Sequence, residues 1–245
     1  MKDLSWIKED YIAHRGLHTK DLSVPENSML AFQKAVELGY SIEFDLNMLF
    51  DGTIVVFHDF NLKRLTGVDQ NISKLTYDDI KDLKLYDTNE HIPLLSEVLD
   101  YVDGKVPLLI ELKPFGDTEI FCQLFYDTIK DYKGKWAVFS FNPGVVRWFK
   151  NHHPEIIRGQ ITEFFKDNLK MKKIVKFLMK TMFFNRFTKP DFVSYRIQDL
   201  PNKYVDKAKQ DGLTIISYAA RTQEQLDFVR HTYDNVVFEY FIPKK

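Results

Sequence analysis

Short runs of β-branched and other apolar residues alternate along the chain with longer stretches whose apolar positions recur at helical spacing. Glu26–Leu38 is a stretch of the second kind, and Gly39 follows it as a helix-ending residue. Further helices are predicted at Pro143–Asn151, Asn202–Gln210 and Thr222–Thr232. Strands are predicted at Tyr11–Ala13, Ser41–Leu46, Pro107–Leu112, Trp136–Phe141, Ile156–Ile161, Phe192–Tyr195, Thr214–Tyr218 and Asn235–Glu239.

This alternation of strands and helices predicts the fold class. Strands separated by helices form crossover units, and crossover units build a parallel sheet. Eight such units in 245 residues fit an α/β protein of the (β/α)8 TIM barrel type, which typically has about 250 residues. A doubly wound open sheet is the competing architecture.

One segment interrupts the rhythm. Asp51-Gly52 is a hairpin turn signal, and Thr53–Phe57 is a short β run directly after it. The residues that follow, up to the helical stretch Leu95–Val102, are polar and irregular. We therefore expect a small insertion after the second strand, at about residues 53–93, that roofs the site within one domain over residues 1–245.

Composition and charge narrow the class of protein. Lys and Arg number 34 against 35 Asp and Glu, a net charge of -1, which excludes a chain-wide basic footprint for nucleic acid. A single cysteine, Cys122, excludes an intramolecular disulfide and a thiolate zinc cluster, and fits a reducing compartment. The first ten residues contain no apolar stretch of the kind found in a secretory signal peptide, and no run of about 18 apolar residues could span a membrane. We therefore expect a cytoplasmic protein. Nothing in the sequence indicates an oligomeric state.

Two strand candidates carry carboxylates within apolar runs, where a polar side chain is costly unless it has a role. Glu43 and Asp45 are two residues apart and share one face of their strand, and Glu111 occupies the next central strand. Three carboxylates near strand ends suit a hard divalent ion, Mg2+ or Ca2+, at the end of a barrel where active sites lie. The competing interpretation is that they only pair with Arg15 and Lys113.

Two histidines also end strand-like runs, His14 after the first strand and His58 after Thr53–Phe57. A single histidine there is usually a structural hydrogen-bonder, but two beside a metal can act as base and acid in cleaving a phosphodiester. Arg15 and Lys113 would then contact the phosphate oxygens.

Several short motifs follow one another in a fixed order. They are Ala13-His14-Arg15-Gly16, Pro25-Glu26-Asn27-Ser28, Glu43-Phe44-Asp45, Asp51-Gly52, His58-Asp59, Leu62-Lys63-Arg64-Leu65-Thr66-Gly67, Ile92-Pro93-Leu94-Leu95 and Glu111-Leu112-Lys113. In this order and spacing the chain resembles the glycerophosphodiester phosphodiesterases, densely over residues 11–113 and weakly thereafter.

The resemblance implies a (β/α)8 barrel with an insertion after the second strand, and hydrolysis of a small glycerophosphodiester to glycerol 3-phosphate and an alcohol. It implies a divalent metal held by Glu43, Asp45 and Glu111. It also implies His14 and His58 as general acid and base, and Arg15 and Lys113 as phosphate contacts. Asn27 would lie close to the phosphate or the metal, and Glu26 would be structural.

The second half of the chain departs from the family pattern. Where the family often has Trp-Thr-Val-Asn near the seventh strand, this chain has Ser217-Tyr218-Ala219-Ala220, and Glu239-Tyr240 replaces a Thr-Asp pair after the eighth. Tyr218 can still supply an aromatic wall to the substrate site. These changes leave the predicted reaction centre intact and leave the recognition of the substrate head group open.

Residues 166–189 combine many lysines with large apolar residues. One interpretation is an ordinary barrel helix with its apolar stripe packed on the sheet and its lysines in water. The other is a basic amphipathic element that makes peripheral contact with an anionic membrane.

Three alternatives to the leading function stay open. A lysophospholipase D acting at a membrane surface uses the same chemistry. A phosphatidylinositol-specific phospholipase C also uses a barrel and two histidines, but the three-carboxylate set disfavours it. A non-catalytic phosphate- or lipid-binding module would be expected to lack a metal ligand or a histidine, and this sequence keeps them all.

Overall fold

The computed structural model describes residues 2–244, and their contacts group into two compact units. One unit is Ile12–Trp136, and the other combines Met1–Tyr11 with Ala137–Lys245. The prediction of a single domain stays a prediction. Eight of the nine predicted site residues lie in the first unit.

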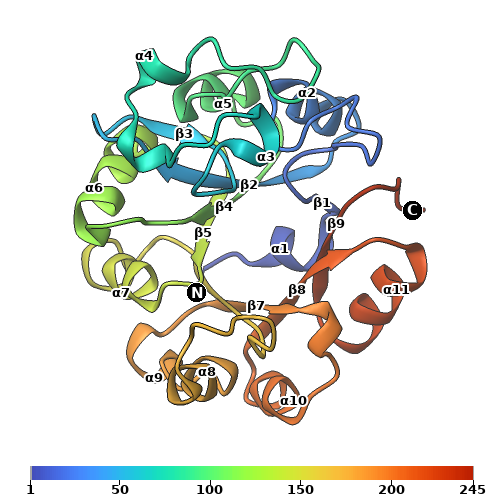
Figure 1. The fold of residues 1–245 in the computed structure, drawn as a ribbon. Helices are drawn as coiled ribbons and strands as arrows, with labels where there is room; N and C mark the ends of the chain where they lie inside the picture. The colour runs from blue at the N-terminus through green and yellow to red at the C-terminus, as the bar shows by residue number, and fades with distance from the viewer. Residues whose placement is uncertain (1, 245) are drawn as a thin grey trace. The chain divides into compact units, whose positions relative to one another are not determined.

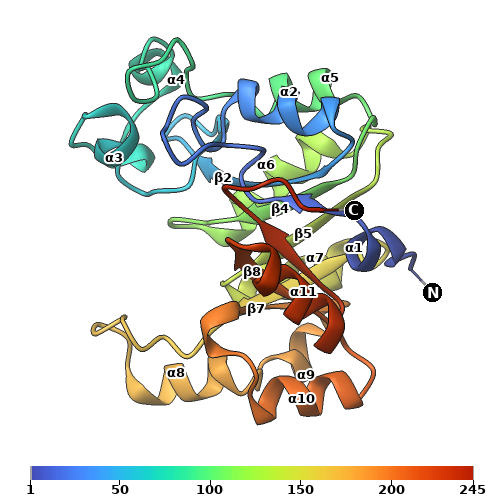
Figure 2. The same cartoon turned by 90° about the vertical axis from the view of Figure 1, so that its right-hand side faces the viewer.

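The unit Ile12–Trp136 contains three parallel strands and one antiparallel strand. Strand β2 pairs in parallel with β1 and β4, and antiparallel with β3. The strands are β1 (Ile12–Ala13), β2 (Ser41–Met48), β3 (Ile54–Val56) and β4 (Leu108–Leu112). The helices are α2 (Met29–Glu37), α3 (Lys63–Thr66), η1 (Ile72–Lys74), α4 (Tyr77–Ile80), α5 (Leu95–Val102) and α6 (Thr118–Ile129). Figure 1 shows α2 and α5 lying together on one side of β2, and Figure 2 shows α3 and α4 at the edge of the unit.

The second unit is a run of parallel strands joined by helices. The strands are β5 (Trp136–Ser140), β6 (Arg158–Thr162), β7 (Phe192–Arg196), β8 (Thr214–Ala220) and β9 (Asn235–Phe238), each hydrogen-bonded to the next in chain order. The helices are α1 (Ser5–Glu9), α7 (Pro143–His152), α8 (Lys173–Lys180), α9 (Asn185–Thr188), η2 (Ile197–Asp199), α10 (Lys203–Gln210) and α11 (Gln223–Thr232). None of the helices in the described part of the chain is long and apolar enough to cross a membrane.

The order of the elements confirms the predicted (β/α)8 barrel class. The eight predicted strands correspond to β1, β2 and β4 to β9, and the observed ends lie close to the predicted ones. Their buried side chains are mainly Ile, Val, Leu and Phe, as expected for parallel strands that are covered on both faces. The additional strand β3 forms the predicted hairpin with β2.

The region after β3 differs from the expectation of an irregular polar segment. It contains α3, η1 and α4, and its apolar residues pack with Leu49 and Val55 of the β2–β3 hairpin in one small core. That core consists of Leu49, Val55, Phe57, Leu62, Leu65, Ile72, Ile80, Leu85 and Ile92. The insertion is therefore a packed subdomain, because its apolar residues converge although they follow no helical or strand period.

Candidate active site

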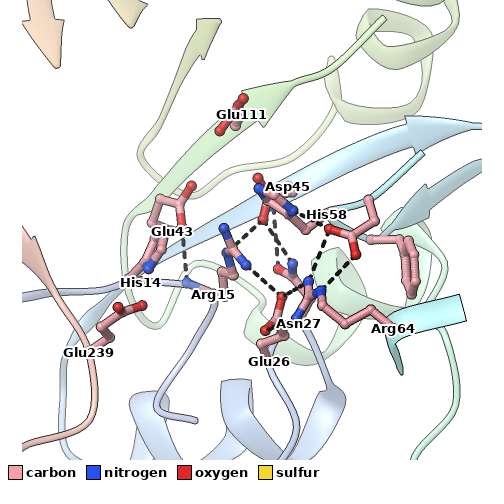
Figure 3. Close-up of polar contacts among 12 residues, drawn as sticks. His14, Arg15, Glu26, Asn27, Glu43, Asp45, His58, Arg64, Glu111 and Glu239 are labelled. Atoms are coloured by element: carbon pink, nitrogen blue, oxygen red, sulfur yellow. Dashed lines mark hydrogen bonds and ion pairs between the residues drawn. The ribbon is translucent and has the colours of Figure 1, made fainter. Parts of the chain in front are cut away.

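Three carboxylates meet on two neighbouring strands of the first unit (Figure 3). Glu43 and Asp45 are two apart on β2 and so project from the same side, and Asp45 is the parallel-register partner of Glu111 on β4. The residues are only 2%, 1% and 8% exposed, respectively. Oxygens from the three side chains lie within 4.8 Å of one another. The predicted metal ligands are thus brought together as one buried cluster.

Two cations lie against this cluster. Nε of Arg15 is 3.3 Å from Oδ2 of Asp45, and Nζ of Lys113 lies 3.3 Å from both Oδ1 of Asp45 and Oε1 of Glu111. Buried carboxylates are strongly destabilising unless they are paired. Arg15 and Lys113 therefore stabilise the cluster, as the competing interpretation of the sequence proposed. They also place positive charge beside the position that an anionic ligand of the cluster would occupy.

The loop between β1 and α2 positions Arg15 and Asn27 through backbone conformations that are unusual for residues other than glycine. Arg15, Gly16 and Asn27 have φ values of 55°, 75° and 56°, all in the left-handed region. The Arg15 amide donates to Oε2 of Glu43 at 3.0 Å, and the Asn27 amide donates to the Arg15 carbonyl at 2.9 Å. A Cβ atom at position 16 would lie 2.9 Å from the backbone carbon of Ala31, so glycine permits this close approach.

Asn27 contacts the cluster directly. Its Nδ2 donates to Oδ2 of Asp45 at 2.9 Å, and its Oδ1 accepts from the Asp45 amide at 3.3 Å. Helix α2 consequently starts later than the predicted Glu26, because Ser28 is its N-cap and accepts from the Ala31 amide. The residues expected at the first turn of the helix are instead in the site.

The two histidines have different surroundings. Nε2 of His14 lies 3.9 Å from Oε2 of Glu43. Nδ1 of His58 lies 2.6 Å from Oδ1 of Asp59, a contact that orients the imidazole and leaves its other nitrogen available for proton transfer. The His58 backbone is held close to the cluster, because the Phe57 amide donates to the Asp45 carbonyl and Asn47 Nδ2 donates to the Phe57 carbonyl.

Arg64, from helix α3 of the insertion, joins two parts of the site. Its Nη1 and Nη2 each donate to one oxygen of Glu26 at 2.8 Å. Its Nε and Nη2 donate to the two oxygens of Asp59 at 2.7 and 3.0 Å. Glu26 also accepts from Arg15 at 2.6 Å. A continuous chain of charged contacts therefore runs from Arg15 through Glu26, Arg64 and Asp59 to His58 (Figure 3).

The sequence interpretation did not include Asp59 or Arg64 among the site residues. Both residues belong to motifs quoted above. Arg64 pairs with Glu26, which lies 38 residues earlier in the sequence, so the contact forms only in the folded structure. Glu26, which was expected to be structural, orients Arg15. The arginines lower its pKa to about 2, although burial alone would raise it.

The pKa values of the three clustered carboxyl groups diverge. Burial, together with the charges of Asp45 and Glu111, raises the pKa of Glu43 well above its ordinary range. Burial likewise raises the pKa of Glu111 to about 7, against the attraction of Lys113. Burial would also raise the pKa of Asp45, but the charges of Lys113, His58 and Arg15 hold it well below its ordinary range. The three carboxyl groups of the cluster therefore carry more negative charge, when all are ionised, than Arg15 and Lys113 neutralise.

These properties fit a divalent metal ion. The donors are all carboxylate oxygens, which Mg2+ and Ca2+ prefer, and they converge from two rigid strands. The pKa values of Glu43 and Glu111 are raised by burial and, in addition, by the neighbouring carboxylates, and a cation bound between these groups would favour their charged forms. Glu43, Asp45 and Glu111 are the residues that would hold it.

A cavity of about 620 Å3 opens beside these groups. Its lining residues are His58, Asp59, Phe60, Asn61, Lys63, Arg64 and Lys113. Phe60 is 43% exposed, and its ring lies 5.6 Å from that of Phe115, which is 58% exposed. The insertion thus borders the site and contributes Phe60, whose ring packs on that of Phe115 from the loop after β4.

Eight of the nine predicted site residues are brought together in this way. They are His14, Arg15, Asn27, Glu43, Asp45, His58, Glu111 and Lys113. Tyr218 belongs to the second unit, where it lies on β8 and its ring contacts Phe141 edge-on. A contribution of Tyr218 to substrate binding stays a prediction.

Fold and site together define an α/β barrel with a carboxylate and histidine centre at its strand ends. Comparison with protein families gives a more specific result. The model of the glycerophosphoryl diester phosphodiesterase family matches residues 14–237, nearly the whole chain, and the chain belongs to this family.

Individual relatives agree with this assignment. A lysophospholipase D of Rattus norvegicus is 35% identical over 136 residues, which are 50% of this chain and 41% of the relative. A glycerophosphodiester phosphodiesterase of Bacillus altitudinis is 33% identical over 165 residues, which are 61% of this chain and 65% of the relative. The chain matches less than half the length of the first relative.

Solved structures share the fold. A phosphodiesterase of Oleispira antarctica in complex with the product sn-glycerol-3-phosphate superposes with a TM-score of 0.80 at 23% identity, over 96% of this chain and 94% of that chain. A glycerophosphodiester phosphodiesterase of Thermotoga maritima gives a TM-score of 0.71 at 24% identity, over 93% of both chains. At these identities the likeness establishes the fold.

We predict that Arg64→Ala lowers kcat by about 10- to 100-fold, the usual cost of removing a group that orients catalytic residues. Arg64→Lys should restore little, because lysine cannot form two-bond pairs with both Glu26 and Asp59. Steady-state kinetics would check this, with KM expected to change much less than kcat. Lys81→Ala, which removes an exposed ion pair with Asp78 elsewhere in the insertion, is the control. Unchanged kcat in Arg64→Ala would contradict the orienting role.

Proposed function

We propose that this protein is an enzyme that hydrolyses glycerophosphodiesters to glycerol 3-phosphate and an alcohol. The observation that carries the proposal is the convergence of three buried carboxylates, two histidines and two cations beside one cavity. Membership of the family and the names of the relatives support the same reaction. A small soluble diester is the substrate.

A divalent ion, Mg2+ or Ca2+, bound by Glu43, Asp45 and Glu111 would supply positive charge to the phosphate and lower the pKa of the water molecule that attacks phosphorus. Cleavage of the diester also needs a proton removed from the attacking oxygen and a proton delivered to the leaving alkoxide. His14 and His58 share these two tasks. Asp59 keeps the His58 ring in one orientation during both.

Arg15 and Lys113 bind the phosphate in this proposal. Nε of Arg15 is buried and has no hydrogen-bond acceptor among the described residues, although it lies near Asp45. A buried donor without an acceptor is costly, and a phosphate oxygen would satisfy it. Lys113 lies between two carboxylates and lines the cavity, so its charge reaches the same anion.

A lysophospholipid substrate is the second candidate, and one observation favours it. The exposed rings of Phe60 and Phe115 lie against one another, and Phe60 lines the same cavity as His58 and Lys113. An apolar wall at this place would contact an acyl chain rather than water. The enzyme would then act as a lysophospholipase D on the same phosphodiester.

The test is the release of glycerol 3-phosphate from glycerophosphocholine and glycerophosphoethanolamine, and of lysophosphatidic acid from lysophosphatidylcholine. Each substrate is supplied with Mg2+, Ca2+ or EDTA, with His14→Ala as the inactive control. Release of glycerol 3-phosphate that needs both metal and His14 supports the main proposal. Faster cleavage of the lysophospholipid, lost in the double variant Phe60→Ser and Phe115→Ser, supports the second. No release from any substrate would leave a non-catalytic binding module.

A further inference from the structure

Residues 166–189, here called the basic segment, include α8, α9 and the loop before α8. Eight of the 24 residues are Lys or Arg and one, Asp167, is acidic, although the whole chain has a net charge of only -1. Figure 2 shows the loop extending away from the strands of its unit ahead of α8. A strong positive charge is thus concentrated on one projecting part of the fold.

The basic segment also exposes large apolar side chains. Leu169 is 92% exposed, Ile174 61%, Phe177 50% and Phe187 53%. Of the residues in α8, Met179 is the one that is buried. The interpretation of α8 as an ordinary barrel helix, with its apolar stripe packed on the sheet, therefore does not account for three of its five apolar residues, Ile174, Val175 and Phe177, which are exposed.

The apolar and basic side chains of α8 form adjacent rows. Ile174 and Phe177 are three residues apart and share one exposed side of the helix. Lys173, Lys176 and Lys180 follow each other at spacings of three and four and form the neighbouring row. This arrangement places cations beside exposed hydrocarbon along the whole helix.

Most of these cations are not neutralised within the protein. Lys166 pairs with Asp199, and Asp167 pairs with Arg196. Lys170, Lys172, Lys173, Lys176 and Lys189 have no acidic partner within 4 Å among the residues that the structure describes. Their charge is available to an external anionic surface.

We propose that the basic segment docks this protein on an anionic lipid bilayer. Lysines beside exposed leucine, isoleucine and phenylalanine match an interface whose head groups are negative and whose interior is apolar. A nucleic acid would satisfy the charges and could stack on Phe177 and Phe187, but it would leave the aliphatic side chains of Leu169 and Ile174 in water. The docking requires no membrane-spanning helix and does not depend on the proposed reaction.

Vesicle co-sedimentation of the full chain tests the proposal. The vesicles are phosphatidylcholine alone or mixed with phosphatidylglycerol, at low and at physiological salt. A charge variant combines Lys172→Gln, Lys173→Gln and Lys176→Gln. An apolar variant combines Leu169→Ser, Ile174→Ser and Phe177→Ser. The matched control combines Lys20→Gln, Lys74→Gln and Lys133→Gln, which remove the same charge from exposed positions elsewhere.

We expect salt-sensitive binding to the anionic vesicles and none to pure phosphatidylcholine. Each lysine near an anionic surface strengthens partitioning by about fivefold, so the charge variant should bind about 100-fold more weakly. The apolar variant should lose at least about tenfold, and the control should bind normally. Circular dichroism and hydrolysis of a soluble diester would show that the variants are folded and that a loss is specific to the membrane.

Three results would overturn the proposal. The first is no binding to anionic vesicles at low salt. The second is equal binding by the charge variant and the matched control. The third is retention of the chain by an RNA homopolymer but not by vesicles, which would assign the basic segment to a polyanion instead. A chain that binds vesicles but hydrolyses no diester would leave the docking intact and refute only the proposed reaction.

Discussion

His58→Ala should lower kcat for a glycerophosphodiester by about 100-fold or more, since this is the usual contribution of a general acid or base. His58 is the histidine whose orientation is fixed by a carboxylate, through the 2.6 Å contact with Asp59, and it lines the cavity beside Lys113. Removing the ring leaves the carboxylate cluster in place, so substrate binding should suffer less than turnover. Release of glycerol 3-phosphate under saturating substrate would measure the effect.

Two comparisons make this result specific. His231→Ala removes an exposed histidine of α11 and should leave kcat unchanged. Asp59→Asn should give an intermediate loss, because the ring remains while its orienting carboxylate is replaced. The thermal midpoint of His58→Ala should stay close to that of the unchanged protein, since the imidazole is partly exposed. Near-normal turnover in a folded His58→Ala protein would exclude it as acid or base.

Glu43→Gln should abolish the stabilisation of the protein by divalent metal. A metal at 100 times its dissociation constant adds about 2.7 kcal/mol to the free energy of unfolding. For a chain of this length that corresponds to a rise in Tm of about 5–10 °C. The unchanged protein should show this rise with Mg2+ or Ca2+ and lose it with EDTA, as followed by differential scanning fluorimetry.

The same substitution should act in the opposite direction without metal. Glu43 is buried beside two further carboxylates, and its raised pKa reflects the cost of charging it there. A neutral amide removes that cost, so in EDTA the variant should melt at the same temperature as the unchanged protein or above it. Asp131→Asn, an exposed carboxylate of the same unit, is the control for a general effect of charge. A variant that retains the full metal-induced rise would refute the ligand set.

The strands of this fold could be predicted from sequence because their signal is local. Runs such as Ser41–Met48 and Leu108–Leu112 are rich in apolar residues, and their carboxylates recur at the period of a strand. Two carboxylates on one strand share a face by geometry alone, which is why Glu43 and Asp45 were correctly expected together. Helix α6, Thr118–Ile129, was not among the predicted helices although Asp117 caps it and its buried residues follow helical spacing.

Other parts of the site depend on contacts that local patterns do not encode. The prediction of a helix from Glu26 failed because Asn27 adopts a left-handed backbone and bonds to Asp45, a residue 18 positions away. Arg64 stands in a motif that the sequence analysis quoted, but no role was predicted for it. That Arg64 forms ion pairs with both Glu26 and Asp59 becomes evident only in the folded structure, which places these two carboxylates on either side of its guanidinium group.

The insertion shows the same limit at the level of packing. Its apolar residues, such as Leu65, Ile72 and Ile80, are spaced too irregularly to predict a helix or a strand. Their burial arises because short segments from several turns converge on one point. The period at which apolar residues recur predicts helices and strands, but it does not predict a core that is built from segments of a few residues each.

The concentration of the reaction groups in Ile12–Trp136 has an evolutionary consequence. The carboxylates, both histidines and the orienting arginines are encoded in the first half of the chain, whereas the basic segment and Tyr218 are encoded in the second. If the basic segment docks on a membrane as proposed, substitutions within it change that docking without replacing any of the proposed reaction groups in Ile12–Trp136. Under these two proposals, membrane attachment and hydrolysis can evolve through substitutions at separate positions of the chain.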